Sequence, residues 1–265
     1  MNAPFRLAAS SYLNSAPLIW SFFHGQHRGS VDFVEAAPAR CAQLLSEGSV
    51  AGALAPVIEY QRISSGSLVP NVCVGSQKEV LSVVLVSQKK ELESIRQVAL
   101  DESSRTSATL VKVIFREFLQ HEPEWTTQAP NLEAMLEKND AALIIGDPGM
   151  TFRRHGLSVW DMAGLWRQHT GLGFVFAMWM IRDDAVEQAR QVDFAGARDE
   201  GVAHIEEIVR SYQDKLPMTV AELRNYLQEN IVFNVDESME KGLRLYFELA
   251  HKHKLIERVK PLKFI

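Results

Sequence analysis

Short apolar segments of strand length alternate with amphipathic segments of helix length, and this alternation constrains the fold most. Expected strands lie at residues 5–10, 31–34, 50–55, 81–87, 98–100, 141–145 and 174–181. Between them, one expected helix is opened by Pro17 and stopped at Gly25, another runs from Pro38 to Gly48, and a third covers 105–120. Strands separated by helices need crossover connections, so the pattern predicts an α/β protein with parallel strands.

The pattern changes after Arg182, where only helices are expected. Thr219 and Glu222 form a capping box, and Glu237–Lys254 reads as a long amphipathic helix. The long apolar strands near 80–88 and 174–182 suit two lobes joined by two crossing strands, with the C-terminal helices returning to the first lobe. This places the first lobe at residues 1–86 plus 183–265 and the second at 87–182, with a ligand cleft between them. Periodicity alone equally allows one doubly wound sheet.

Composition and missing motifs exclude several classes of function. A net charge of -5 argues against a nucleic-acid binder held by general basicity. No apolar run reaches the ~18 residues that span a bilayer, and MNAPFRLAASSYLN lacks the apolar core of an export signal, so we expect a cytoplasmic protein with no membrane partner. No metal-ligand motif, nucleotide-binding glycine motif or GxSxG elbow occurs, and we therefore expect no metal and no cofactor.

Four polar segments follow expected strands, at the carboxyl ends where ligands of parallel α/β sheets gather. They are residues 10–14, 56–60, 102–107 and 146–148. The third joins a strand to a helix N-terminus, where exposed N–H groups and the helix dipole favour an anion. Hydroxyls of Ser104, Thr106 and Ser107 add donors there. The alternative is plain capping of a helix by serine.

The other segments carry weaker signals, each with an ordinary structural alternative. Ser10, Ser11 and Asn14 form a polar cluster after the first strand, and they are equally typical of a cap or a turn. Ser82 heads an apolar strand, where a buried serine bonded to backbone is the alternative. Asp147 follows another strand, where an Asx turn is the alternative.

Six motifs in a fixed order resemble one family. They are SYLN at 11–14, PVIEY at 56–60, SVVL at 82–85, SSRTS at 103–107, IGD at 145–147, and a segment from Trp166 through Thr170-Gly171 to FVFA at 174–177. This series resembles the chorismate dehydratases of the futalosine route to menaquinone and spans about residues 7–182. Ser15-Ala16 departs from a frequent Thr-Lys pair, and Pro148 departs from the usual GDAA, which puts the shape of the cleft in doubt.

The resemblance implies a two-lobed fold of the periplasmic-binding-protein type II kind, with the ligand between the lobes. It implies a hydro-lyase that converts chorismate to 3-[(1-carboxyvinyl)oxy]benzoate and water without a cofactor. The expected partner is thus a small dicarboxylate, and the oligomeric state is left open. We expect Asn14 to be catalytic. The expected substrate-binding residues are Ser10, Ser11, Ser82, Ser104, Arg105, Thr106, Ser107 and Asp147.

The matched motifs contain no histidine or lysine, and Asp147 and Glu59 are their only carboxylates. Our hypothesis is that the enolpyruvyl carboxylate of the substrate takes the C3 proton, while protein hydroxyls and amides hold the substrate in place. Catalysis would then come mainly from positioning and electrostatics, with Asn14 near the departing hydroxyl. Asp147 and Glu59 stay open as alternative proton acceptors.

Two rival functions stay open beside this one. The first is a dihydroxynaphthoate synthase-like enzyme of the same pathway on a similar fold, although SYLN and SSRTS fit the dehydratase better. The second is a non-catalytic protein that binds a small acid. For either kind of ligand, the binding energy of two carboxylates would favour closure of the lobes.

Overall fold

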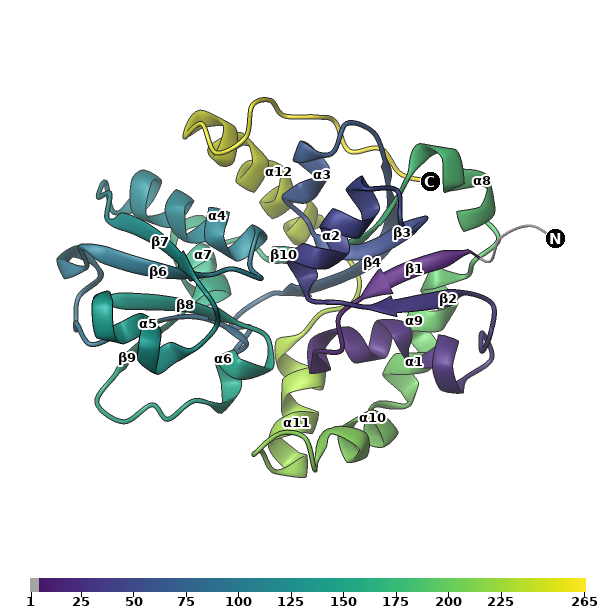
Figure 1. Cartoon of the computed structure of the whole chain (residues 1–265), viewed down its shortest axis with the longest axis horizontal. Helices are drawn as coiled ribbons and strands as arrows, with labels where there is room; N and C mark the ends of the chain where they lie inside the picture. The colour runs from purple at the N-terminus through teal and green to yellow at the C-terminus, as the bar shows by residue number, and fades with distance from the viewer. Residues whose placement is uncertain (1–4) are drawn as a thin grey trace.

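The computed structural model describes residues 5–265 and contains two five-stranded sheets (Figure 1). Residues 1–4 lie outside the described part. They begin both the first lobe and the segment that were considered from the sequence, the latter as an export signal. The first sheet has the order β2-β1-β3-β10-β4. Its strands are β1 Arg6–Ala9, β2 Asp32–Glu35, β3 Gly52–Pro56, β4 Ser67–Ser76 and β10 Phe174–Ile181. β1 is parallel to β2 and β3, whereas β10 is antiparallel to both β3 and β4.

The second sheet repeats this plan with the order β7-β6-β8-β5-β9. Its strands are β5 Val83–Ser87, β6 Gln97–Asp101, β7 Glu124–Gln128, β8 Ala141–Ile145 and β9 Ser158–Asp161. β6 is parallel to β7 and β8, and β5 is antiparallel to β8 and β9. We call each sheet with the helices packed on it a lobe. The predicted two-lobed α/β architecture is confirmed.

Helices connect and cover the strands. In the first lobe they are α1 Ala16–His24, α2 Pro38–Ser46 and α3 Glu59–Arg62. In the second they are α4 Thr106–Val113, α5 Leu132–Lys138, α6 Asp147–Thr151 and α7 Met162–Thr170. The C-terminal part adds α8 Val186–Ala189, α9 Phe194–Ala203, α10 Ile205–Tyr212, α11 Val220–Asn225 and α12 Glu237–Lys252. π-helical turns at Ile114–Phe118 and Tyr226–Asn230 continue α4 and α11, and the predicted capping box of Thr219 and Glu222 is present.

Strand pairing assigns two strands, β5 and β10, to the lobe opposite to the one expected from the sequence. The boundary at 86/87 assigns β5 to the first lobe, but β5 pairs with β8 and β9. The boundary at 182/183 assigns β10 to the second lobe, but β10 pairs with β3 and β4. Each of these apolar strands is the antiparallel strand of one sheet, so the chain crosses between sheets beside them, at residues 77–82 and 171–173. We therefore propose the lobe boundaries at these two crossing segments.

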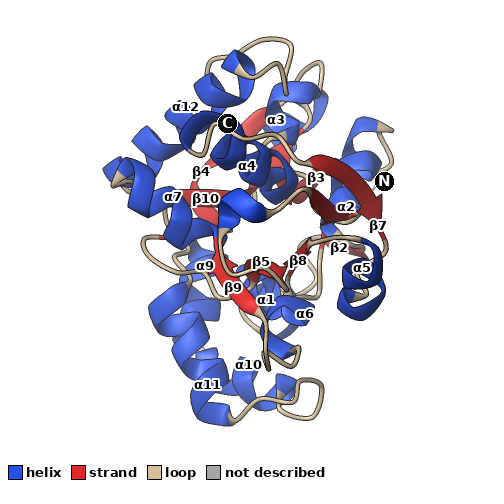
Figure 2. Ribbon diagram, turned by 90° about the vertical axis from the view of Figure 1, so that its left-hand side faces the viewer, coloured by secondary structure: helices blue, strands red, loops and turns tan. Residues whose placement is uncertain are grey.

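The C-terminal helices do not all return to the first lobe. α9 and α10 pack against α1 of the first lobe, but α12 contacts both β10 and α4 (Figures 1 and 2). The Tyr246 hydroxyl donates to the Thr106 carbonyl over 2.9 Å, and Lys252 and His253 both pair with Glu117 beyond α4. α12 therefore ties the second lobe to the first.

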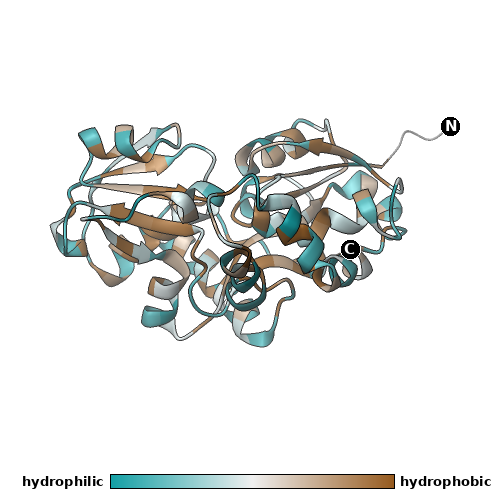
Figure 3. Cartoon of the chain, turned by 90° about the horizontal axis from the view of Figure 1, so that it is seen from below, coloured by the Kyte–Doolittle hydropathy of each residue, from teal (hydrophilic) through white to brown (hydrophobic). Residues whose placement is uncertain are grey.

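The apolar core runs through both sheets. Hydrophobic residues concentrate on the strands, and hydrophilic residues on the outer helices (Figure 3). Every residue of β3, β5 and β8 is buried, and β10 is buried except at Ala177. Burial on both faces explains why these strands read as continuous apolar runs in the sequence. Within residues 5–265, no helix combines the length and apolarity needed to cross a membrane.

The contact of α12 with the second crossing segment predicts the effect of Gly242→Ala. A Cβ at Gly242 would overlap the carbonyl oxygen of Gly173, a backbone atom that cannot rotate away. Overpacking of this kind costs about 1–3 kcal/mol, so the free energy of unfolding in urea should fall by that amount. Gly164→Ala in α7 is the control, because its nearest neighbour would be the flexible Glu79 side chain at 3.4 Å. An equal loss in both variants would contradict the prediction.

Candidate functional site

A pocket with an empty volume of about 530 Å³ lies between the two lobes. Ser10 follows β1, Pro56 ends β3, Ser103 follows β6, and Ile145 ends β8, and all four line this pocket. The carboxyl ends of parallel strands from both sheets thus face one space, as the sequence predicted.

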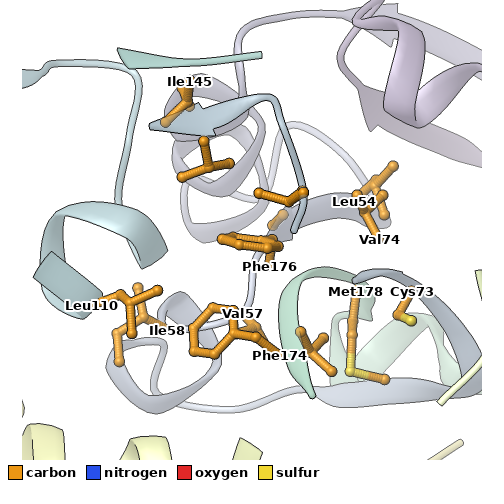
Figure 4. Packing of buried hydrophobic residues seen from close by; sticks show 14 of the residues in the cluster. Leu54, Val57, Ile58, Cys73, Val74, Leu110, Ile145, Phe174, Phe176 and Met178 are labelled. Atoms are coloured by element: carbon orange, nitrogen blue, oxygen red, sulfur yellow. The ribbon is translucent and has the colours of Figure 1, made fainter. Parts of the chain in front are cut away.

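The apolar part of the pocket is built from both sheets. Leu54, Val74 and Phe176 come from the first sheet, and Val83 and Ile145 from the second. Figure 4 shows Phe176 with Leu54 and Val74 on one side and Ile145 on the other. An aromatic ring and branched aliphatic chains in this position suit the apolar ring of a ligand.

The polar part of the pocket comes from two loops. The loop after β1 contributes Ser10, Tyr12, Asn14 and Ser15, and the loop after β6 contributes residues 103–107. Arg105, an exposed residue, is the single charged residue in the lining, since the described residues place no Asp, Glu, His or Lys there. The pocket therefore favours a negatively charged ligand.

Residues at the start of α4 both form structural hydrogen bonds and line the pocket. Ser104 precedes the N-cap residue Arg105, and its Oγ accepts a hydrogen bond from the Ala108 N–H of the first turn at 3.2 Å. Thr106 Oγ1 accepts from the Ile58 N–H at 3.3 Å, a bond from the second lobe to the first. Ser104, Thr106 and Ser107 nevertheless all line the pocket at the N-terminal end of a helix. The helix dipole favours negative charge at this end.

Asn14 is held in place by two neighbours. Ser15 Oγ donates to Asn14 Oδ1 at 3.2 Å and lies 2.9 Å from Ser10 Oγ. The Asn14 side chain also lies within hydrogen-bonding reach of the buried Tyr226 hydroxyl. Because its oxygen accepts from Ser15, the Asn14 NH₂ group is left to donate.

Ser82 does not line the pocket. It is completely buried, and the Tyr226 hydroxyl donates to Ser82 Oγ over 2.7 Å. Tyr226 thus connects Ser82 to Asn14 from behind the pocket wall. The sequence suggested a buried serine bonded to backbone as the alternative for Ser82; the partner is instead a phenol.

Asp147 also lies outside the lining and holds the loop after β1. Its Oδ1 accepts the Leu13 N–H at 3.0 Å, a bond between the lobes. Burial raises the pKa of Asp147 to about 6. Beside it, the Tyr12 ring rests on Gly146, where a Cβ would come within 2.6 Å of Tyr12 Cε2 and where φ is +68°. Only glycine fits this position without strain.

Two further residues considered from the sequence lie away from the lining. Ser11 is exposed, and its carbonyl accepts a hydrogen bond from the Tyr212 hydroxyl at 2.6 Å. Glu59, the other candidate proton acceptor, pairs with Arg62 at 2.6 Å.

The pocket brings together six of the nine residues named from the sequence. These six are Ser10, Asn14, Ser104, Arg105, Thr106 and Ser107. Sequence reasoning missed Tyr12, Ser15 and Ser103, although all three stand in or beside the SYLN and SSRTS motifs. It also missed Tyr226, for which the sequence offers no signal, since a tyrosine in an amphipathic helix is typical of a core position.

The raised pKa of Asp147 predicts a pH-dependent difference between wild type and Asp147→Asn. The folded-state pKa of about 6 lies above the ordinary 3.8, so this carboxyl favours the folded state when protonated and loses that contribution as pH rises through 6. The variant keeps an oxygen for the Leu13 N–H but carries no charge. In urea unfolding it should be the more stable protein at about pH 7.5, and the gap should narrow toward about pH 5. A gap that does not change with pH would contradict this.

Comparison with known proteins places the chain in a family. A family model described as menaquinone biosynthesis matches residues 5–252. A curated protein of Thermus thermophilus, named chorismate dehydratase, is 29% identical over 264 residues, which cover 92% of this chain and 94% of that protein.

Solved structures share the fold. The crystal structure of a protein from Archaeoglobus fulgidus has a TM-score of 0.78 at 18% identity, covering 95% of this chain and 98% of that one. The periplasmic aliphatic sulphonate binding protein of Escherichia coli has a TM-score of 0.64 at 14% identity, covering 99% and 94%. The fold is therefore of the periplasmic-binding-protein kind, and the match over most of its length shows that the chain belongs to the menaquinone biosynthesis family.

Proposed function

We propose that this protein is a chorismate dehydratase, a carbon–oxygen lyase that converts chorismate to 3-[(1-carboxyvinyl)oxy]benzoate and water. Membership of the menaquinone biosynthesis family and the name of the Thermus relative support this function. The observation that carries it is the lining of the pocket, which combines one arginine, small hydroxyls, an amide and a tyrosine with an apolar wall. We propose that the reaction needs no cofactor.

The proposed substrate fits this lining by charge and shape. Chorismate carries one carboxylate on its ring and one on its enolpyruvyl arm. Arg105 and the N-terminal end of α4 supply positive charge and donors for carboxylates, with Thr106 and Ser107 beside them. The apolar wall around Phe176 receives the ring. Two carboxylates bound between the lobes would favour closure of the lobes around the substrate.

Among residues 5–265, the lining offers no Asp, Glu, His or Lys as a base for the C3 proton. The carboxylates considered from the sequence, Asp147 and Glu59, lie outside it and already bind Leu13 and Arg62. This arrangement favours the substrate's own enolpyruvyl carboxylate as the proton acceptor. The protein then orients that arm against the C3 hydrogen, and positioning supplies most of the rate.

Asn14 has the geometry to act at the reacting centre. Asn14 lines the pocket, and its oxygen accepts from Ser15. We propose that one N–H of its NH₂ group donates to the C4 hydroxyl or the substrate carboxylate, while the other faces Tyr226. A fixed donor aimed at developing negative charge lowers the barrier without reorganisation.

The cytoplasm is the proposed location, since a biosynthetic enzyme works where its small-molecule substrate is made.

Incubation with chorismate tests the function directly. We expect loss of the diene absorbance, appearance of an aromatic product, and a mass lower by one water.

Arg105→Met should raise KM roughly tenfold, because a charged hydrogen bond to a carboxylate is lost. Arg244→Met is the matched control, as Arg244 pairs with Glu240 on the surface of α12. Binding of unchanged chorismate would instead indicate a non-catalytic receptor. If chorismate were neither bound nor converted, that result would favour the dihydroxynaphthoate synthase-like alternative.

A set of three variants tests the substrate as its own base. Asn14→Ala should lower kcat about 100-fold, as loss of one fixed donor does. Asp147→Asn and Glu59→Gln should each keep kcat within about threefold of wild type, because neither carboxylate would take part in proton transfer. Steady-state rates and product affinity are measured for all three. If Asp147→Asn or Glu59→Gln abolished turnover while product still bound, that carboxylate would be the base.

A further inference from the structure

Tyr12 is the one side chain in the described pocket lining that belongs to the usual classes of general acid. The other polar groups there are serine and threonine hydroxyls, the Asn14 amide and the Arg105 guanidinium. An amide donates a hydrogen bond but gives up no proton, and a guanidinium stays protonated in proteins. If a protein group supplies a proton in this pocket, Tyr12 is therefore the candidate.

Two neighbouring groups at the end of β6 set the surroundings of the Tyr12 phenol. Ser103 and Tyr12 both line the pocket, and Ser103 Oγ donates to Asp101 Oδ1 at 2.6 Å. Asp101 is 1% exposed, and its negative charge disfavours a second negative charge on the phenol of Tyr12.

The Tyr12 ring is held in position by its neighbours. The ring rests on Gly146, and the next residue along the loop, Leu13, donates its N–H to Asp147. Burial raises the pKa of Tyr12, and Asp101 and Asp147 act in the same direction. The phenol therefore keeps its proton at neutral pH, as a proton donor must before the reaction begins.

We propose that Tyr12 is a catalytic residue that gives its phenolic proton to the departing C4 hydroxyl group. This inference rests on the proposed dehydratase function. The C3–H bond breaks as its proton passes to the enolpyruvyl carboxylate, and its electron pair becomes a ring double bond. The C4–O bond breaks with its pair on oxygen, and that oxygen takes the Tyr12 proton and leaves as water. The substrate carboxyl then returns the C3 proton to the tyrosinate, so the step balances without another reagent.

Tyr12→Phe tests this role, because it removes one oxygen and keeps the ring on Gly146. We expect kcat to fall about 100-fold while KM and product affinity change little, as is typical of losing general-acid assistance. The solvent deuterium isotope effect on kcat should also shrink. The matched control is Tyr60→Phe, which loses a hydroxyl that donates to the Pro261 carbonyl outside the pocket. This control should keep wild-type kcat.

The outcomes separate the two proposals. If wild type leaves chorismate unchanged, the dehydratase function fails. If wild type turns over and Tyr12→Phe keeps kcat within about threefold, only the role of Tyr12 is overturned. Should Tyr12→Phe lose its fold or its product binding, Tyr12→3-fluorotyrosine tests the same phenol, because it keeps the ring and the hydroxyl and lowers the pKa of the phenol. The alkaline limb of the pH profile of kcat should move to lower pH, and an unmoved profile would overturn the proposal.

Discussion

The whole site depends on how the first crossing segment, residues 77–82, is fixed between the lobes. The half-buried Asp161 carboxylate accepts N–H bonds from Val80, Leu81 and Gly164, so it joins this segment to the start of α7. Burial raises the pKa of Asp161, and the three donors oppose that shift by favouring the charged form. Leu81 has a φ of +60°, a strained conformation that persists because these bonds hold it. Movement here would change the distance between the two sheets and therefore the pocket.

Contacts between the lobes carry the second part of the architecture. Asp147 and Thr106 of the second lobe accept N–H bonds from Leu13 and Ile58 of the first, and α12 lies against both lobes. The first bond joins the SYLN loop to the IGD segment, and the second joins the PVIEY segment to the SSRTS loop, so each polar wall of the pocket is fixed to the opposite lobe. Residues that line the pocket are thus held by residues outside it, as a preorganised site requires. Tyr226 is a further example, since its hydroxyl bonds to Ser82 and lies within reach of Asn14 from behind the wall.

Most of the fold could be predicted from the sequence because its central strands are buried on both faces. β3, β5, β8 and β10 read as apolar runs for that reason, while β4, β7 and β9 are absent from the expected strands. β7 and β9 lie at the edges of the second sheet and are only partly buried, so they lack a continuous apolar run. The buried run of β4 is interrupted by the exposed Pro70 and Asn71. The proposed lobe boundaries differ from those expected from the sequence for a related reason: an apolar run indicates burial but says nothing about which sheet the strand joins.

The sequence by itself determined the α/β class, the helical C-terminal part and the segments that form the pocket. Polar loops after apolar strands must gather at the carboxyl ends of a sheet, whatever the details. Only the tertiary structure decided which residues line the pocket. Ser82 bonds to Tyr226, 144 residues away, and Asp147 bonds to Leu13, 134 residues away. Tyr12 and Ser103, in contrast, line the pocket. Such choices follow from packing between distant segments, and local sequence carries no record of a partner so far along the chain.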